Sequence, residues 1–70
     1  MKKSTIGENA GVVWRTLYGK KLSWDELAAA TGLSATDLAT AVGWLAREDK
    51  ISFLTENGTE HLEIYHENYY

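Results

Sequence analysis

Apolar residues recur at helical spacing through the first two thirds of the chain and at alternating positions near its end. The first apolar run advances in steps of three and four, which places its members on one stripe of a helix: Ile6, Ala10, Val13, Trp14 and Leu17. Thr5 and Glu8 have the spacing of an N-terminal capping box, and Gly19 is typical of a helix stop. The pattern predicts a helix over about residues 5–18.

A second, shorter helix is predicted over about residues 24–31. Ser23 and Glu26 repeat the capping-box spacing. Asp25 adds another acidic side chain to the first turn, where the helix dipole favours negative charge. Gly32 is the expected stop. So short a helix is marginal alone and must be held by packing against the rest of the domain.

A third helix is predicted over about residues 35–48, with Ser34 as its N-cap. At about 100° per residue, four apolar side chains cluster on one arc and form the expected core face: Leu38, Ala41, Val42 and Leu45. The opposite arc is small and hydroxylated, with one basic residue: Thr36, Thr40, Gly43 and Arg47. Trp44 lies between the two arcs.

The last segment changes to a period of two around Asn57-Gly58, a strong signal for a type I′ hairpin turn. Counting outward from the turn pairs apolar residues across the hairpin: Phe53 with Leu62, and Ile51 with Ile64. All four then fall on one sheet face, which supports this register. The strands are predicted at about 51–56 and 59–66, with a short extra strand at residues 20–22.

This order predicts a mainly α fold with a small antiparallel β-hairpin (α+β), built as a single domain over residues 1–70. The chain has no cysteine, so neither a disulfide nor a thiolate metal site is available. Its core must therefore come from the 44% of residues that are hydrophobic. Two lysines near the N-terminus are not followed by a long apolar stretch, which predicts a cytoplasmic protein without a signal peptide or membrane span.

Charge is distributed unevenly along a chain whose formal net charge is −3. Residues 1–21 hold five basic residues and one acidic residue, among them Lys20 and Lys21. Residues 22–50 hold two basic and five acidic residues, and residues 51–70 hold four glutamates and no basic residue. This balance is not typical of a nucleic-acid-binding domain.

Three residues carry a resemblance to a known family. Ala28, Gly32 and Leu38 stand at the spacing of a helix-turn-helix, and the chain resembles the winged helix-turn-helix fold across residues 5–66. Asp49-Lys50 stands where that family often has glycine. More narrowly, the chain resembles short, stand-alone bacterial winged-helix proteins of unassigned function, a likeness that implies the fold and no mechanism.

The resemblance implies that the third helix would enter the major groove of DNA by its exposed arc. The matching residues are Ser34, Ala35, Thr36, Thr40, Gly43 and Arg47, and Lys20 and Lys21 could lie beside the DNA backbone. The charges oppose this reading, because affinity for DNA comes largely from neutralised phosphates. The wing tip, which is basic in DNA-binding members, here carries Glu56 and Glu60.

A second hypothesis is a protein-interaction module built on the same scaffold. Gly7 and Gly11 lie one turn apart in the first helix, where each glycine costs about 0.5–1 kcal/mol relative to alanine. Close approach of another helix would explain them, either within the chain near Gly43 or from a second copy in a homodimer. Trp44, Leu54 and Tyr65 would add apolar surface to an interface.

Catalysis has little support in the sequence. His61 and His66 have opposite parity in the last strand, so they point to opposite faces and cannot share a metal. No nucleophile–base set or carboxylate pair converges, and a filled 70-residue core leaves little room for a substrate. We therefore predict no enzyme activity, catalytic residue, metal, cofactor or membrane partner. Two hypotheses remain: a DNA-binding, transcription-related protein, and a protein–protein interaction module.

Overall fold

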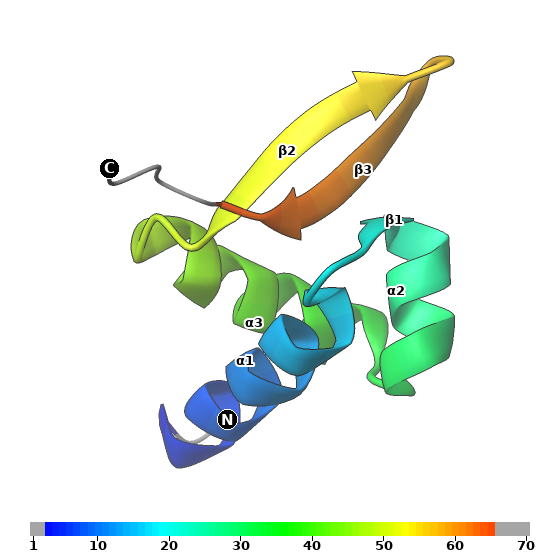
Figure 1. Ribbon diagram of the computed structural model, residues 1–70. Coiled ribbons are helices and arrows are strands. Elements are labelled where there is room, and N and C mark those ends of the chain that lie inside the picture. The colour runs from blue at the N-terminus through cyan, green and yellow to red at the C-terminus, as the bar shows by residue number, and fades with distance from the viewer. Residues whose placement is uncertain (1–2, 66–70) are drawn as a thin grey trace.

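Within residues 3–65, three helices and a three-stranded antiparallel sheet make up the fold (Figure 1). The computed structural model describes residues 3–65, with side chains from residue 5 onward. The elements follow the order α1 (Lys3–Leu17), β1 (Lys21–Ser23), α2 (Trp24–Thr31), α3 (Ala35–Arg47), β2 (Ile51–Glu56) and β3 (Thr59–Ile64). The predicted α+β winged helix-turn-helix class is confirmed. The short extra strand ahead of α2 is present and lies one residue later than the predicted range 20–22.

Capping residues fix both ends of α2. The Ser23 hydroxyl accepts a hydrogen bond from the Glu26 amide at 3.2 Å, and the Glu26 carboxylate accepts one from the Ser23 amide at 2.9 Å. These two bonds form the capping box that the spacing predicted, and they lower the pKa of Glu26. At the other end, Gly32 takes a left-handed conformation with φ 71° and donates to the Ala28 carbonyl.

The first helix differs from its prediction at both ends. It is already helical at Lys3 and ends at Leu17, where the residue range 5–18 was expected. Thr5 and Glu8 therefore lie inside α1, and the predicted capping box is wrong, because an N-cap residue must have non-helical backbone angles. Gly19 follows the helix with φ 74°, as a stop signal requires.

The third helix ends at Arg47, one residue before the predicted end. Asp49 follows with φ 57°, a left-handed backbone that glycine adopts most readily and that Asp tolerates better than most residues. The position where the family often has glycine therefore keeps the backbone conformation of glycine. Lys50 then leads into β2, which begins at Ile51.

The sheet has the order β1-β3-β2, so β3 is its central strand. The predicted hairpin register is confirmed, with Phe53 opposite Leu62 and Ile51 opposite Ile64. Both turn residues have positive φ, 52° at Asn57 and 79° at Gly58, as a type I′ turn requires. β3, the second strand of the wing, ends at Ile64. His66, the predicted last residue of the wing, lies outside the described residues.

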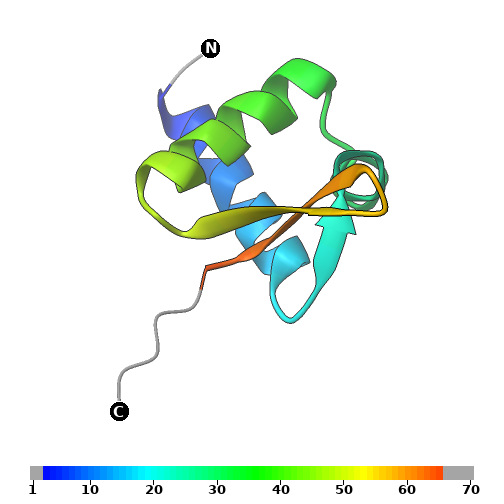
Figure 2. The same cartoon turned by 90° about the horizontal axis from the view of Figure 1, so that it is seen from above.

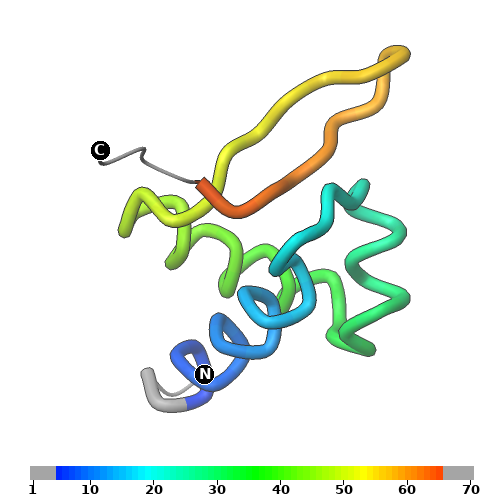
Figure 3. Tube along the Cα trace, in the orientation of Figure 1, coloured from blue at the N-terminus to red at the C-terminus, as the bar shows by residue number. Residues whose placement is uncertain are grey.

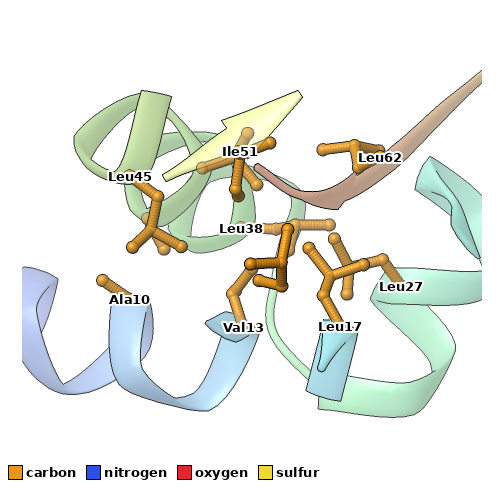
Figure 4. Packing of buried hydrophobic residues seen from close by; sticks show 11 residues of the cluster. Ala10, Val13, Leu17, Leu27, Leu38, Leu45, Ile51 and Leu62 are labelled. Carbon is orange, nitrogen blue, oxygen red and sulfur yellow. The ribbon is translucent and has the colours of Figure 1, made fainter. Parts of the chain in front are cut away.

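The core lies between the three helices and the base of the sheet (Figure 4). Its buried members come from every helix and from β2 and β3: Ala10, Val13, Leu17, Leu27, Leu38, Ala41, Val42, Leu45, Ile51, Leu62 and Ile64. Phe53 shares a sheet face with this cluster and is nevertheless 45% exposed. The reason is visible in Figure 3, where the hairpin rises away from the helices toward its tip.

Glycine substitutions at two positions are expected to have opposite effects on stability. Gly7 lies inside α1, and a Cβ added there would meet no atom within 4 Å. Gly7→Ala should therefore raise the free energy of unfolding by about 0.5–1 kcal/mol. Gly32→Ala should lower it by about 1 kcal/mol, because its left-handed backbone disfavours any Cβ. Urea denaturation at low chain concentration measures the free energy of unfolding of both variants. Equal changes would contradict the proposal that Gly7 is an ordinary helical position and that Gly32 needs its left-handed backbone.

Candidate nucleic-acid interface

The exposed face of α3 lies opposite its core stripe. Leu38, Ala41, Val42 and Leu45 are buried, as predicted. The residues proposed to meet DNA lie on the solvent side: Ser34, Ala35, Thr36, Gly43 and Arg47 are exposed, and Thr40 is half-buried. The structure therefore brings these six residues onto one helix and leaves its outer surface open.

Hydroxyl groups on this face are held by local hydrogen bonds. The Ser34 hydroxyl caps α3 by accepting from the Asp37 amide at 3.1 Å. The Thr40 hydroxyl donates to the Thr36 carbonyl at 2.8 Å, which orients its oxygen and leaves its lone pairs free to accept. The Thr36 side chain is exposed, and both its donor and its acceptor capacity face solvent. This face therefore offers small polar groups in fixed positions and one flexible cation, Arg47.

The basic residues do not form one patch with α3. Lys21 lies on β1 at one edge of the sheet, whereas Arg47 precedes β2 at the other edge. The Lys21 ammonium also donates to the Glu56 carboxylate, which forms an ion pair between β1 and the wing. Lys20 is exposed and beside it. Of the other residues in the predicted basic region, Lys2 and the Lys3 side chain lie outside the described part of the chain.

The wing tip is tied to β1 and α2 by its two glutamates. Glu56 accepts from Lys21, and Glu60 accepts a hydrogen bond of 2.6 Å from the Trp24 indole Nε1. Both views of the fold place the hairpin tip above α2 (Figures 1 and 2). The sequence reasoning missed these contacts. The one sequence signal for these contacts was charge: the hairpin is acidic and the first strand is basic. Charge complementarity could therefore have predicted that the two lie side by side.

The hydrogen bond from Lys21 lowers the pKa of the Glu56 carboxyl below its ordinary value of 4.5 and raises the pKa of the lysine. A lowered pKa in the folded state means that the pair stabilises the fold above pH 4.5 and ceases to do so as Glu56 becomes protonated at lower pH. Both side chains are partly exposed, so solvent weakens the effect.

Lys21→Met should therefore raise the pKa of Glu56, and it should reduce stability at neutral pH more than at a pH of about 2. Side-chain carboxyl shifts followed by NMR against pH measure the first effect. Lys20→Met is the matched control and should leave the Glu56 titration unchanged. An equal shift in both variants would mean that general charge, and not the Lys21 contact, sets the pKa.

Of the residues predicted for an interface, Gly7, Gly11 and Trp44 lie together. They line a shallow groove of about 290 Å³ between α1 and the C-terminal part of α3, which also includes Trp14, Arg15 and Lys50. The Trp44 side chain lines this groove from α3 and is 40% exposed. A Cβ on Gly43 would meet no atom within 4 Å, so this glycine makes no close helix contact within the chain.

The other two predicted interface residues lie on the sheet. Leu54 is half-buried on the outer face of β2, and Tyr65, just beyond β3, is 45% exposed. The backbone amide of Tyr65 donates to the carbonyl of Lys50 at 2.9 Å, and Lys50 lines the groove. The exposure of the Phe53 and Tyr18 rings was not predicted. Phe53 belongs to the apolar face of the hairpin, which indicated burial, and Tyr18 stands at the predicted end of the first helix.

Within residues 3–65, no three His, Cys, Asp or Glu side chains are placed to hold a metal ion. His61 is half-buried, and its Nδ1 lies 3.0 Å from the Thr59 carbonyl oxygen. No helix in the same range is long and apolar enough to cross a membrane. What the described surface presents is a small polar helix face, a groove and an internally paired wing.

Known proteins resemble this chain in sequence, in fold or in both. MJ1608, an uncharacterized protein of Methanocaldococcus jannaschii, is 40% identical over 55 residues, which cover 74% of this chain and 79% of the relative. The solution NMR structure of BT2368 from Bacteroides thetaiotaomicron is similar with a TM-score of 0.80 and 42% identity, covering 91% of this chain and 79% of that one. HlyU from Vibrio cholerae N16961 has a TM-score of 0.63 at 21% identity, covering 91% and 80%, and shows likeness of fold alone.

The match to a family model extends over nearly the whole chain. It covers residues 1–64 and therefore includes all three helices, the turn that joins α2 to α3, and both strands of the wing. The chain belongs to the winged helix-turn-helix domain family DUF2582.

Proposed function

We propose that this chain is a non-enzymatic DNA-binding protein of low affinity, related to transcription, that places the exposed face of α3 in the major groove. The observation that carries the proposal is the composition of that face. Its side chains are small or hydroxylated from Ser34 to Gly43, and the opposite face of the same helix is fixed in the core. A helix held in this way can approach base edges and phosphates closely.

Contacts at the N-terminus of α3 support the same orientation. Ser34, Ala35 and Thr36 are exposed at the end of the helix where the dipole is positive and favours a phosphate. Asp37 in this turn weakens that preference, although its backbone amide is already bonded to Ser34. Arg47, at the other end, supplies the one cation of the face. Few phosphates are neutralised, so binding is weak and confined to low salt.

The internal bonds of the wing change its electrostatic role. The Lys21 ammonium compensates the charge of Glu56, whereas Glu60 is bonded to the neutral Trp24 indole and keeps its negative charge. The wing therefore repels a phosphate less than its sequence suggests. It also offers no cation, because the nearest lysine is already used. In this proposal α3 carries the binding and the wing contributes little.

The second candidate function is a protein-interaction module, and one observation favours it. Trp44, Phe53 and Tyr65 are each 40–45% exposed, a large aromatic share for so small a surface. Aromatic residues are enriched in the cores of protein interfaces. A partner of this kind would bind at these three rings, which belong to the groove, the wing and the end of β3, and would leave the hydroxylated face of α3 free.

Fluorescence anisotropy with a labelled mixed-sequence duplex separates the two functions. DNA binding predicts a measurable affinity at about 20 mM salt, with log K falling against log salt with a slope of about −2 to −3, since two or three phosphates are contacted. No binding at about 20 mM salt with protein in large excess would reject the DNA proposal. A slope steeper than about −6 would show that residues outside this face dominate the contact.

A further inference from the structure

Two glycines line the groove between α1 and α3. Gly7 and Gly11 contribute to its α1 wall together with Ala10, Trp14 and Arg15. A Cβ on Gly7 would meet no atom within 4 Å, and one on Gly11 would lie 3.3 Å from Arg15 Nη1, the mobile end of a long side chain. Two helical glycines are therefore retained at a cost in stability, although alanine would fit at both positions.

The same side of α1 carries one acidic and one basic residue. Glu8 and Arg15 are exposed, and seven residues separate them, which leaves them within about 20° of each other around the helix. They lie about 10 Å apart along its axis, too far for an ion pair within the helix. Among the side chains described, neither forms a salt bridge. Both charges are thus available to another molecule.

This arrangement of charges is complementary to itself. If two copies of α1 cross antiparallel about a two-fold axis between residues 11 and 12, Glu8 of each copy faces Arg15 of the other. The same axis places Gly11 and Val12 at the crossing point, where the missing side chain of Gly11 allows the helices to approach closely. A two-fold interface needs one such self-complementary surface.

We infer that a second copy of this chain occupies the groove, with the two α1 helices antiparallel and the glycine wall of each copy against the other. Trp44, 40% exposed beside the glycines, then covers the partner helix in the reciprocal position. A standard interface buries about 800 Å² per partner, roughly a sixth of the 4834 Å² surface of this domain. The inference is independent of DNA binding, because none of the six residues proposed to contact DNA lines the groove.

A partner protein of other chemistry fits the groove less well. Arg15 and Lys50 line the groove without an acidic residue, and would alone favour any acidic occupant. Glu8, which lies outside the lining of the groove but close to Arg15 around the helix, would repel such an occupant. A second copy satisfies Glu8 and Arg15 at once.

Sedimentation equilibrium of the full chain over a wide concentration range tests the inference. The mass should move from the 7.8 kDa of one chain toward twice that value as concentration rises. Arg15→Glu places like charges at both ends of the crossing and should weaken association about ten-fold. Glu8→Arg combined with Arg15→Glu exchanges the charges and should restore it. Gly11→Leu should abolish it by holding the helices apart.

Two controls make each outcome decisive. Arg47→Glu reverses a charge on α3 and should leave the dimer unchanged, and circular dichroism establishes that every variant is folded. A wild type that stays monomeric at about 1 mM would overturn the inference, because a complex with a Kd of 1 mM would by then hold half of the chains. A dimer that is indifferent to Arg15→Glu and Gly11→Leu would also overturn it, by placing the contact on another face.

Discussion

Leu62→Ala is expected to lower the free energy of unfolding by about 2–5 kcal/mol, enough to unfold much of so small a domain at ambient temperature. Leu62 is completely buried in β3, the central strand, and lies opposite Leu22 of β1 and Phe53 of β2. Truncation leaves a cavity where the sheet meets the helices. Because both neighbouring strands depend on this contact, the wing and β1 should lose structure together.

Phe53→Ala is the matched control for this substitution. Phe53 faces Leu62 across the hairpin, yet it is 45% exposed and loses less buried surface when truncated. Phe53→Ala should lower the free energy of unfolding by about 1 kcal/mol or less. Urea denaturation followed by circular dichroism measures both variants. Equal losses would show that the hairpin packs onto the helices further toward its tip than the structure indicates.

Glu56→Lys is expected to raise the affinity for mixed-sequence duplex DNA by ten- to a hundred-fold at about 50 mM salt. The substitution gives the wing a cation and releases the Lys21 ammonium from its ion pair. If both lysines reach phosphates, the salt slope grows by about 2, and each added contact is worth about ten-fold at this salt concentration.

Glu8→Lys changes the net charge by the same amount at a different place. Glu8 lies on α1, outside the face proposed for DNA, so its replacement should change affinity by about two-fold or less. Anisotropy titrations of the two variants over a series of salt concentrations make the comparison. Equal gains in affinity would show that binding follows total charge, and that the position of the new lysine on the wing has no effect.

Local sequence signals predicted the framework of the fold because each has a short-range physical cause. Ser23 and Ser34 cap their helices, Gly32 takes a left-handed backbone, and Asn57-Gly58 sets the hairpin register. These effects act within a few residues and can be read without knowledge of the fold. The capping box at Thr5 failed for a related reason, since an isolated motif cannot show that the chain is already helical before it.

Long-range contacts were the part that the sequence did not reveal. The bonds from Lys21 to Glu56 and from Trp24 to Glu60 join residues about half the chain apart. Periodicity placed Phe53 on the core face, but its ring is 45% exposed in the folded chain. The hydroxylated face of α3 was predicted as a surface, and its DNA contacts remain a proposal.

An NMR titration of the isotope-labelled wild type with mixed-sequence duplex DNA tests whether the exposed face of α3 binds DNA. At about 20 mM salt, the amide shifts of Thr36, Thr40 and Arg47 should change together, and these changes should largely disappear at about 200 mM salt. Residues of the α1 groove should shift much less. No perturbation of α3 at the lower salt concentration, or shifts confined to α1 and the outer sheet, would contradict the proposal that α3 binds DNA.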